Sequence, residues 1–332
     1  MIILPNIEGK IWDLEYKVNE IWQELCSQDR VTISLNSEGP CAEGLGLYRL
    51  LDDLCGKGKF DKKKIKIITC NQLEAHDHYQ IDRSPPLRFV KDAQQFYQIN
   101  HDCLHDKKFD SNLKYFGLLI GRSNWVRLWL SADIYQAYPD KLFLSFHWNL
   151  STDFHLYHLG IDEMLRWNAN LRDVENSLLL LKECPIIVDQ VDEYPVLSPQ
   201  NLSVCRMYHK FFLEVICETY FNGNSFFPTE KTWRPLITKT PFIIHGPVNF
   251  LANLKKLGFK TFDKWWDESY DDYGHDLRIN QILTLINQLS KKSAKELETM
   301  YREMLPILDH NFKRFMDLSS SDFNKAFGYH AQ

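Results

Sequence analysis

A segment in the C-terminal half of the chain places an acid and a base where a helix is expected to begin. Residues 226–247, FFPTEKTWRPLITKTPFIIHGP, have the pattern of a loop, a helix and a buried strand. Thr229 suits the N-cap position, so Glu230 and Lys231 fall in the first helical turn. The N–H groups and dipole of a helix attract anions at this end. Either Lys231 helps to hold a phosphate there, or it extends into solvent while Glu230 complements the dipole.

The strands and helices expected around this segment form an α/β pattern. Strands are expected at residues 115–120, 142–147, 209–219 and 241–246. A turn at 121–124 and a helix to about Ala137 follow the first of these strands, and a long amphipathic helical stretch covers residues 276–315. The pattern is typical of an α/β domain with a helical tail.

The N-terminal part of the chain has a second α/β pattern. RVTISLN and KIKIITC are expected to be strands on either side of the helix LYRLLDDLCG, which makes a βαβ unit with a parallel sheet. The glycines between the first strand and the helix do not match the dinucleotide-binding fingerprint. Residues 76–112 are polar and are expected to be irregular. We therefore expect an N-terminal domain at 1–112, a C-terminal domain at 113–290 and a helical tail at 291–332.

Composition narrows the function classes. The chain has 332 residues, of which 44% are hydrophobic and 25% charged, as in globular proteins with more than one core. The net charge of −5 disfavours nucleic acid as a partner without excluding it. The eight cysteines form no CxxC pair, which fits reduced thiols and a cytoplasmic location better than a zinc site or a disulfide scaffold. No signal peptide and no membrane-spanning run is expected.

The segment that follows the strand at 209–219 resembles the donor-binding region of the α-1,3-fucosyltransferase-like glycosyltransferases. Residues that fit the order of that family's motif are Glu218, Thr229, Glu230, Lys231, Pro241 and Gly246. Upstream, FGLLIGRSNWVR is similar to the family's strand, Ser-Asn pair and phosphate-binding arginine, here Asn124 and either Arg122 or Arg127. Residues 254–272 also resemble a segment of uncharacterised bacterial and viral glycosyltransferase-like proteins. The resemblance covers roughly residues 113–290.

The resemblance implies a GT-B fold, in which two Rossmann-like domains face each other across a cleft. It implies an inverting transfer of a sugar from a nucleotide-sugar, with a GDP-sugar as first expectation, to a hydroxyl of a glycan, a glycolipid or a modified nucleotide. Lys231 and an arginine would neutralise the diphosphate without a metal ion, and the chain contains no Asp-x-Asp triplet. Glu230 would hold ribose hydroxyls or the sugar, and Glu218 would contact the donor sugar.

An inverting transfer needs a general base on the acceptor side. Glu38 lies in the loop after the first N-terminal strand, at the edge of the sheet where open α/β folds bind ligands. Glu43 in the same loop is the second candidate, and Glu74 is the third.

Other residues leave alternatives open. Trp265 and Trp266 either stack on an acceptor or close the domain junction, and His245 either reaches the donor or packs at a strand end. Two alternative functions remain: a non-catalytic binding or scaffold protein on the same fold, and a metal-dependent phosphate hydrolase or nuclease. The latter would use the histidines of the polar region as ligands, although their spacing fits no standard set: His76, His78, His101 and His105.

Overall fold

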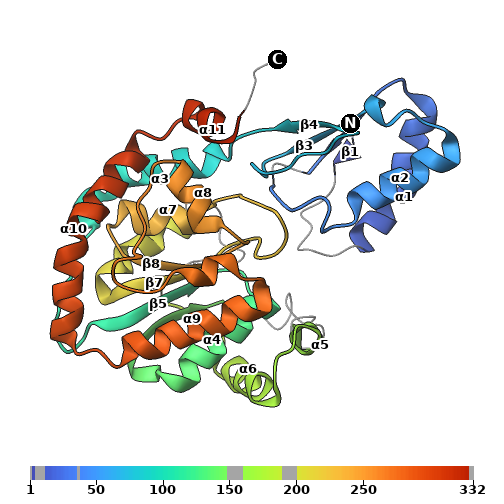
Figure 1. Cartoon of the computed structure of the whole chain (residues 1–332). Helices are drawn as coiled ribbons and strands as arrows, with labels where there is room; N and C mark the ends of the chain where they lie inside the picture. The colour runs from blue at the N-terminus through green and yellow to red at the C-terminus, as the bar shows by residue number, and fades with distance from the viewer. Residues whose placement is uncertain (1, 4–11, 36–37, 148–159, 189–199, 329–332) are drawn as a thin grey trace.

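The computed structural model describes residues 2–3, 12–35, 38–147, 160–188 and 200–328. Within them the chain forms two parallel sheets of four strands each, with helices packed around them (Figure 1). This confirms the expected α/β class. In the described part of the chain, no helix is long and apolar enough to cross a membrane.

The N-terminal sheet contains the expected βαβ unit. Its strands are β1 (Ile2–Ile3), β2 (Val31–Ser34), β3 (Ile65–Thr69) and β4 (Gln80–Arg83), in that spatial order. The helices are α1 (Trp12–Ser27) and α2 (Leu47–Gly58). Alternate residues of β3 are buried, and α2 buries Leu47, Leu51 and Leu54 at helical spacing. The period of each apolar pattern therefore matches its element.

The C-terminal sheet has a different strand order. Its strands are β6 (Leu142–Phe146), β5 (Lys114–Ile120), β7 (Phe211–Cys217) and β8 (Phe242–His245), in the order β6-β5-β7-β8. Both β5 and β7 lie inside the sheet and are almost continuously buried, as expected for parallel strands covered on both faces. The chain leaves β5 toward β6 on one side and returns as β7 on the other. The connections thus change direction between β5 and β7.

Helices cover both faces of this sheet. They are α4 (Trp125–Ala137), α5 (Ile161–Arg166), α6 (Leu171–Glu183), α7 (Glu230–Ile237), α8 (Phe250–Lys256), α9 (His275–Ser290), α10 (Ala294–Met316) and α11 (Ser320–Phe327). Short 3-10 segments lie at Lys62–Lys64, His101–Cys103, Pro139–Lys141, Gln200–Lys210 and Ser269–Asp272. In Figure 1, α4 and α9 lie on one face of the sheet, and α7 and α8 lie on the other.

The expectation of irregular structure at residues 76–112 is wrong. This region contains β4 and a helix, α3 (Leu87–Asn100), whose Val90 and Ala93 are fully buried. Helix α3 packs against α7, so it belongs to the C-terminal core and not to the domain expected at 1–112. Buried residues of α10 and α11 join the same core, so these two helices of the tail expected at 291–332 are also part of it.

The loop between β7 and α7 docks on the N-terminal domain. The side-chain carbonyl of Asn71 accepts a hydrogen bond from Phe226 N at 3.0 Å, and its amide donates to Asn224 O at 2.9 Å. Ser225 Oγ donates to Gly39 O. A Cβ atom at Gly39 would lie 2.5 Å from Phe227 Cβ, so the absence of a side chain there permits this close approach. These contacts join the two halves through one loop.

Replacing Asn71 with alanine should remove this junction. Asn71 is fully buried, and its loss leaves Phe226 N without its acceptor and removes one of the three hydrogen bonds to the Glu74 carboxylate. We expect the free energy of unfolding to fall by at least about 2 kcal/mol, because each buried donor or acceptor left unpaired costs about 1–3 kcal/mol. Urea denaturation measures the loss. The exposed Asn324→Ala should change it by no more than about 0.5 kcal/mol, and an equally small change in Asn71→Ala would contradict the role of this side chain.

Candidate functional site

The residues singled out in the C-terminal half meet at the carboxyl ends of β5 and β7. Asn124 and the two arginines follow β5, whereas Glu218, Thr229, Glu230 and Lys231 follow β7. In open α/β sheets, ligands bind outside the carboxyl ends of the strands at the point where the connections change direction. The strand order β6-β5-β7-β8 puts that point between β5 and β7. The topology thus identifies the same place as the sequence pattern.

Glu218 organises the start of α7. Its buried carboxylate accepts hydrogen bonds from Thr229 N at 3.1 Å, Thr229 Oγ1 at 2.7 Å, Thr232 Oγ1 at 2.5 Å and Thr219 N at 3.0 Å. Thr229 is the N-cap of α7, as expected from the sequence. Because both Glu218 oxygens are occupied by protein donors, this carboxylate positions the helix. The structure does not show the expected exposure toward a donor sugar.

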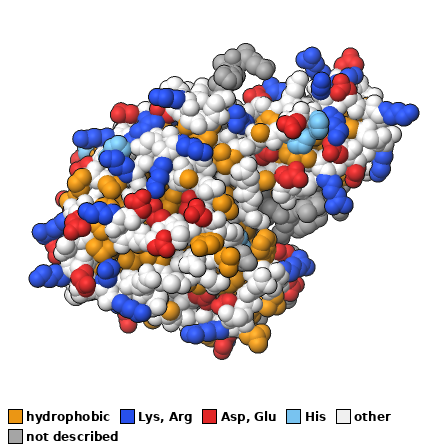
Figure 2. Space-filling model, in the orientation of Figure 1, with side chains coloured by type: hydrophobic (Ala, Val, Ile, Leu, Met, Phe, Trp, Pro, Cys, Tyr) orange, Lys and Arg blue, Asp and Glu red, His pale blue; other side chains and the backbone are white. Residues whose placement is uncertain are grey.

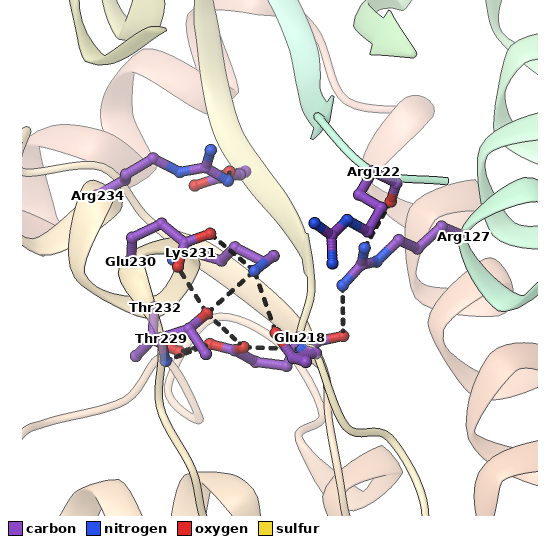
Figure 3. A network of polar contacts seen from close by, with 10 residues as sticks. Arg122, Arg127, Glu218, Thr229, Glu230, Lys231, Thr232 and Arg234 are labelled. Carbon is purple, nitrogen blue, oxygen red and sulfur yellow. Dashed lines mark hydrogen bonds and ion pairs between the residues drawn. The ribbon is translucent and has the colours of Figure 1, made fainter. Parts of the chain in front are cut away.

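Lys231 and Glu230 form an ion pair at the first turn of α7. Lys231 Nζ donates to Glu230 Oε1 at 2.8 Å and to the hydroxyls of Thr219 and Thr229 at 3.2 Å each (Figure 3). Burial alone would raise the pKa of Glu230, but the Lys231 ammonium and the Arg234 guanidinium outweigh it and lower the pKa to about 2. Glu230 is therefore ionised at neutral pH. An incoming phosphate oxygen could replace a neutral hydroxyl on Lys231, since charge-assisted hydrogen bonds are the stronger ones.

The two arginines after β5 have different environments. Arg127 is buried, and its guanidinium donates to Arg122 O at 2.5 Å and to Glu218 O at 3.2 Å. It thereby ties the ends of β5 and β7 together. Asn124 is the N-cap of α4 and accepts a hydrogen bond from Arg127 N at 3.0 Å. Arg122 is exposed. In Figure 3 both guanidinium groups are directed toward the Lys231 side of the site.

Glu38 reaches this cluster from the N-terminal half. Tyr220, in the loop after β7, donates its phenol hydrogen to Glu38 Oε2 at 3.3 Å. Burial raises the pKa of Glu38 above the usual glutamate range, and Glu230 adds to this effect, whereas Lys231, Tyr220 and Arg122 oppose it. Charges on α7 and on the β5–α4 loop therefore act on a carboxylate from the other half of the chain. A carboxylate with a raised pKa suits a general base.

The other two base candidates are placed differently. Glu74 is buried, and its carboxylate accepts hydrogen bonds from Ala42 N, Asn71 Nδ2 and Tyr48 Oη at 2.7–3.0 Å. It holds the 41–46 loop and is not available to a substrate. Glu43 is exposed on that loop. Within the described residues, no hydrogen bond or ion pair joins Glu43 to the cations of the site, so the geometry favours Glu38.

The polar-region histidines do not assemble as a metal site. His76 and His78 lie beside each other and His76 packs on Tyr48, whereas His105 packs on His209 in a different part of the molecule. No cluster of three or more histidine, cysteine, aspartate or glutamate side chains suited to a metal occurs among the described residues. The ligand set required by the hydrolase or nuclease alternative is thus not brought together there.

The remaining sequence candidates have packing roles. Trp266 is buried against Phe262, and Trp265 donates its indole hydrogen to Glu303 at 3.0 Å. Both contacts lie within the C-terminal core, so they do not place the two tryptophans at a junction between the two halves. Gly246 is buried, and a Cβ atom there would approach the Phe250 ring to 2.9 Å. His245 is fully buried, and its Nε2 lies 3.1 Å from Nδ1 of His275.

Sequence reasoning missed two features of the site. Tyr220 was not a candidate, although it lies two residues after Glu218. An aromatic cluster also borders the carboxyl ends of β5, β7 and β8, where the rings of Trp125, Trp167 and Phe221 each lie 4.8–5.2 Å from that of His275. These rings come from distant segments, and the only signal in the sequence was the high aromatic content of 14%.

Replacing Glu218 with glutamine should test whether this carboxylate positions α7. Glutamine has one acceptor oxygen, and its NH₂ group would face donors, so we expect a loss of about 2–4 kcal/mol in the free energy of unfolding. Urea denaturation measures it, with the exposed Glu175→Gln as control. A Glu218→Gln variant as stable as the control would show that the four hydrogen bonds are not what holds the start of α7.

Comparison of the chain with protein-family models, curated proteins and solved structures finds no match. The site is therefore interpreted from its own geometry. The resemblance to fucosyltransferase-like glycosyltransferases stays a prediction.

Proposed function

We propose that this protein is an inverting glycosyltransferase that uses a nucleotide-sugar donor and needs no metal ion. One observation carries the proposal: cationic side chains and the N-terminus of α7 gather at the turning point between β5 and β7, and a carboxylate from the other half faces them. The GT-B arrangement of two facing domains belongs to this proposal. So do the GDP-sugar as first donor to test and a cytoplasmic location.

The cations would hold the donor's diphosphate. Arg122 is the better candidate for the direct contact because it is exposed, whereas Arg127 is buried and donates to backbone carbonyls. Lys231 and the N–H groups at the start of α7 would take up the charge that develops on the diphosphate as its bond to the sugar breaks. These groups supply the neutralisation that other enzymes obtain from a divalent cation.

Glu38 would act on the acceptor. It takes the proton from the acceptor hydroxyl, whose oxygen attacks the anomeric carbon as the bond from that carbon to the diphosphate oxygen breaks. The electron pair of that bond leaves with the diphosphate, beside Lys231 and Arg122. Attack on the face opposite the leaving group inverts the anomeric centre. Such an attack requires the base and the leaving-group cations on opposite sides of the sugar, which a base in one half and cations in the other would provide.

The acceptor is a hydroxyl compound such as a glycan, a glycolipid or a modified nucleotide. On the face shown in Figure 2, basic and acidic side chains are interspersed over the described residues. That distribution does not favour duplex DNA, which is bound through a continuous basic surface. A non-catalytic binding protein is the second candidate, because all three N–H groups of Lys231 already have protein acceptors.

Removing the Arg122 guanidinium should weaken donor binding with little loss of stability, because this side chain is exposed. We expect nucleotide diphosphate affinity to fall about ten- to hundredfold in Arg122→Ala, the usual effect of a lost hydrogen bond to a charged group. A thermal-shift screen with GDP, UDP, CMP and their sugar conjugates, with and without EDTA, identifies the ligand first. Arg302→Ala on α10 is the control. Unchanged affinity for the bound nucleotide in Arg122→Ala would place the diphosphate elsewhere.

Replacing Glu38 with glutamine should leave nucleotide affinity intact and lower turnover by about 10²–10⁴-fold. Turnover is measured as release of nucleotide diphosphate from the nucleotide-sugar, with water as acceptor. The wild-type rate should fall as the pH drops through the pKa of Glu38, since only the carboxylate accepts a proton and burial has raised this pKa. Glu43→Gln serves as the matched control. Normal turnover in Glu38→Gln would transfer the role of base to another group.

A further inference from the structure

Tyr220 links the two halves of the site. It belongs to the loop after β7, yet its hydroxyl contacts Glu38, which lies 182 residues earlier in the chain. We propose that Tyr220 is a positioning residue, whose phenol holds the Glu38 carboxylate in the orientation in which it removes a proton from the acceptor. The assignment of Glu38 as base rests on the proposed function, whereas the contact itself does not.

The ring of Tyr220 is fixed by its apolar surroundings. It packs against Phe227 with ring centroids 5.9 Å apart, and Phe227 in turn contacts the edge of Phe89 on α3. Phe227 also fills the space beside Gly39, the neighbour of Glu38. The hydroxyl is therefore carried by a ring that also has an apolar contact of its own. Phenylalanine at this position keeps the ring that packs on Phe227 and removes the hydroxyl that contacts Glu38.

The hydrogen bond distinguishes the two oxygens of Glu38. Oε2 accepts the phenol hydrogen, whereas Oε1 accepts no hydrogen bond from any described residue. One oxygen is thus held by the protein and the other remains for a substrate hydroxyl. An unconstrained glutamate would lose side-chain entropy when it adopts this orientation. The hydrogen bond from the phenol restricts the side chain before a substrate binds, so less entropy is lost in the reaction.

Tyr220 also connects the base to the donor site through one peptide bond. The preceding residue, Thr219, accepts a hydrogen bond from Lys231 Nζ and donates its backbone N–H to Glu218. The same loop is docked on the N-terminal domain by Ser225 and Asn71. The loop therefore contacts both Lys231 and the proposed base, and Tyr220 is the residue of the loop that contacts the Glu38 carboxylate.

Several titratable groups other than Tyr220 lie near the Glu38 carboxylate. Lys231 and Glu230 face it from α7, Arg122 faces it from the β5–α4 loop, and the Cys70 thiol lies near it at the end of β3. Among these groups, Tyr220 is the one whose hydrogen bond to the Glu38 side chain is seen in the described residues. A hydrogen bond donated to the ionised form lowers the pKa of a carboxylate, so removal of the hydroxyl should raise it.

The test compares Tyr220→Phe with the wild type and with Tyr138→Phe, which removes a hydroxyl bonded to Asn287 away from the site. The Glu38 carboxyl is titrated by carbon NMR of protein labelled at the glutamate side-chain carboxyl, and its signal is assigned by its absence in Glu38→Gln. We expect the titration midpoint to move upward in Tyr220→Phe and to stay unchanged in Tyr138→Phe. The acidic limb of the turnover profile should move in the same direction.

Kinetics give the second readout. In Tyr220→Phe, kcat for nucleotide-sugar hydrolysis should fall about tenfold, a part of the roughly 10²–10⁴-fold that general base catalysis contributes, while KM and GDP affinity stay within twofold. An unmoved Glu38 midpoint would overturn the proposal, as would wild-type kcat despite a moved midpoint. If no nucleotide-sugar binds or turns over in the wild type, the proposed function fails, and with it the catalytic meaning of the contact. The NMR titration still decides whether Tyr220 holds Glu38.

Discussion

The site depends on the hydrogen bonds that converge on the Glu218 carboxylate. A buried carboxylate is tolerated only when its oxygens are satisfied, and here both oxygens accept from hydroxyls and backbone N–H groups at the start of α7. This arrangement fixes the end of β7 and the first turn of α7 as one unit. Lys231 and Glu230 then have defined positions because the turn that carries them is fixed. The chemical groups of the proposed donor site are thus arranged by a residue whose own oxygens are occupied by the protein.

A second constraint joins this unit to the rest of the molecule. Arg127 ties the end of β7 to the loop after β5, and the β7–α7 loop docks on Asn71 and Gly39 of the N-terminal half. Cations from two strand ends and a carboxylate from another sheet therefore share one rigid framework. Preorganised charge of this kind is effective in catalysis because it requires no rearrangement at the moment of reaction.

Much of the fold could be predicted from the sequence, but the site only in part. The continuous apolar runs of β5 and β7 indicate buried parallel strands, and the Thr229 pattern predicts the start of α7. Helix α3 was missed because half of its residues are polar and the segment around it is polar, and its buried face shows only against α7. A glutamate at a strand end has the same pattern whether it meets a ligand or caps a helix, so the role of Glu218 required coordinates. The contact of Tyr220 with Glu38 joins residues that no local pattern relates.

The close approach of Phe227 to Gly39 limits which residues can replace glycine at position 39. Position 39 leaves no room for a side chain, because Phe227 already occupies the volume that even a methyl group would need. A larger residue would push the β7–α7 loop away from the N-terminal half. The distance between Glu38 and the residues that this loop positions would then increase. The absence of a side chain at position 39 thus sets how closely this loop approaches the N-terminal half.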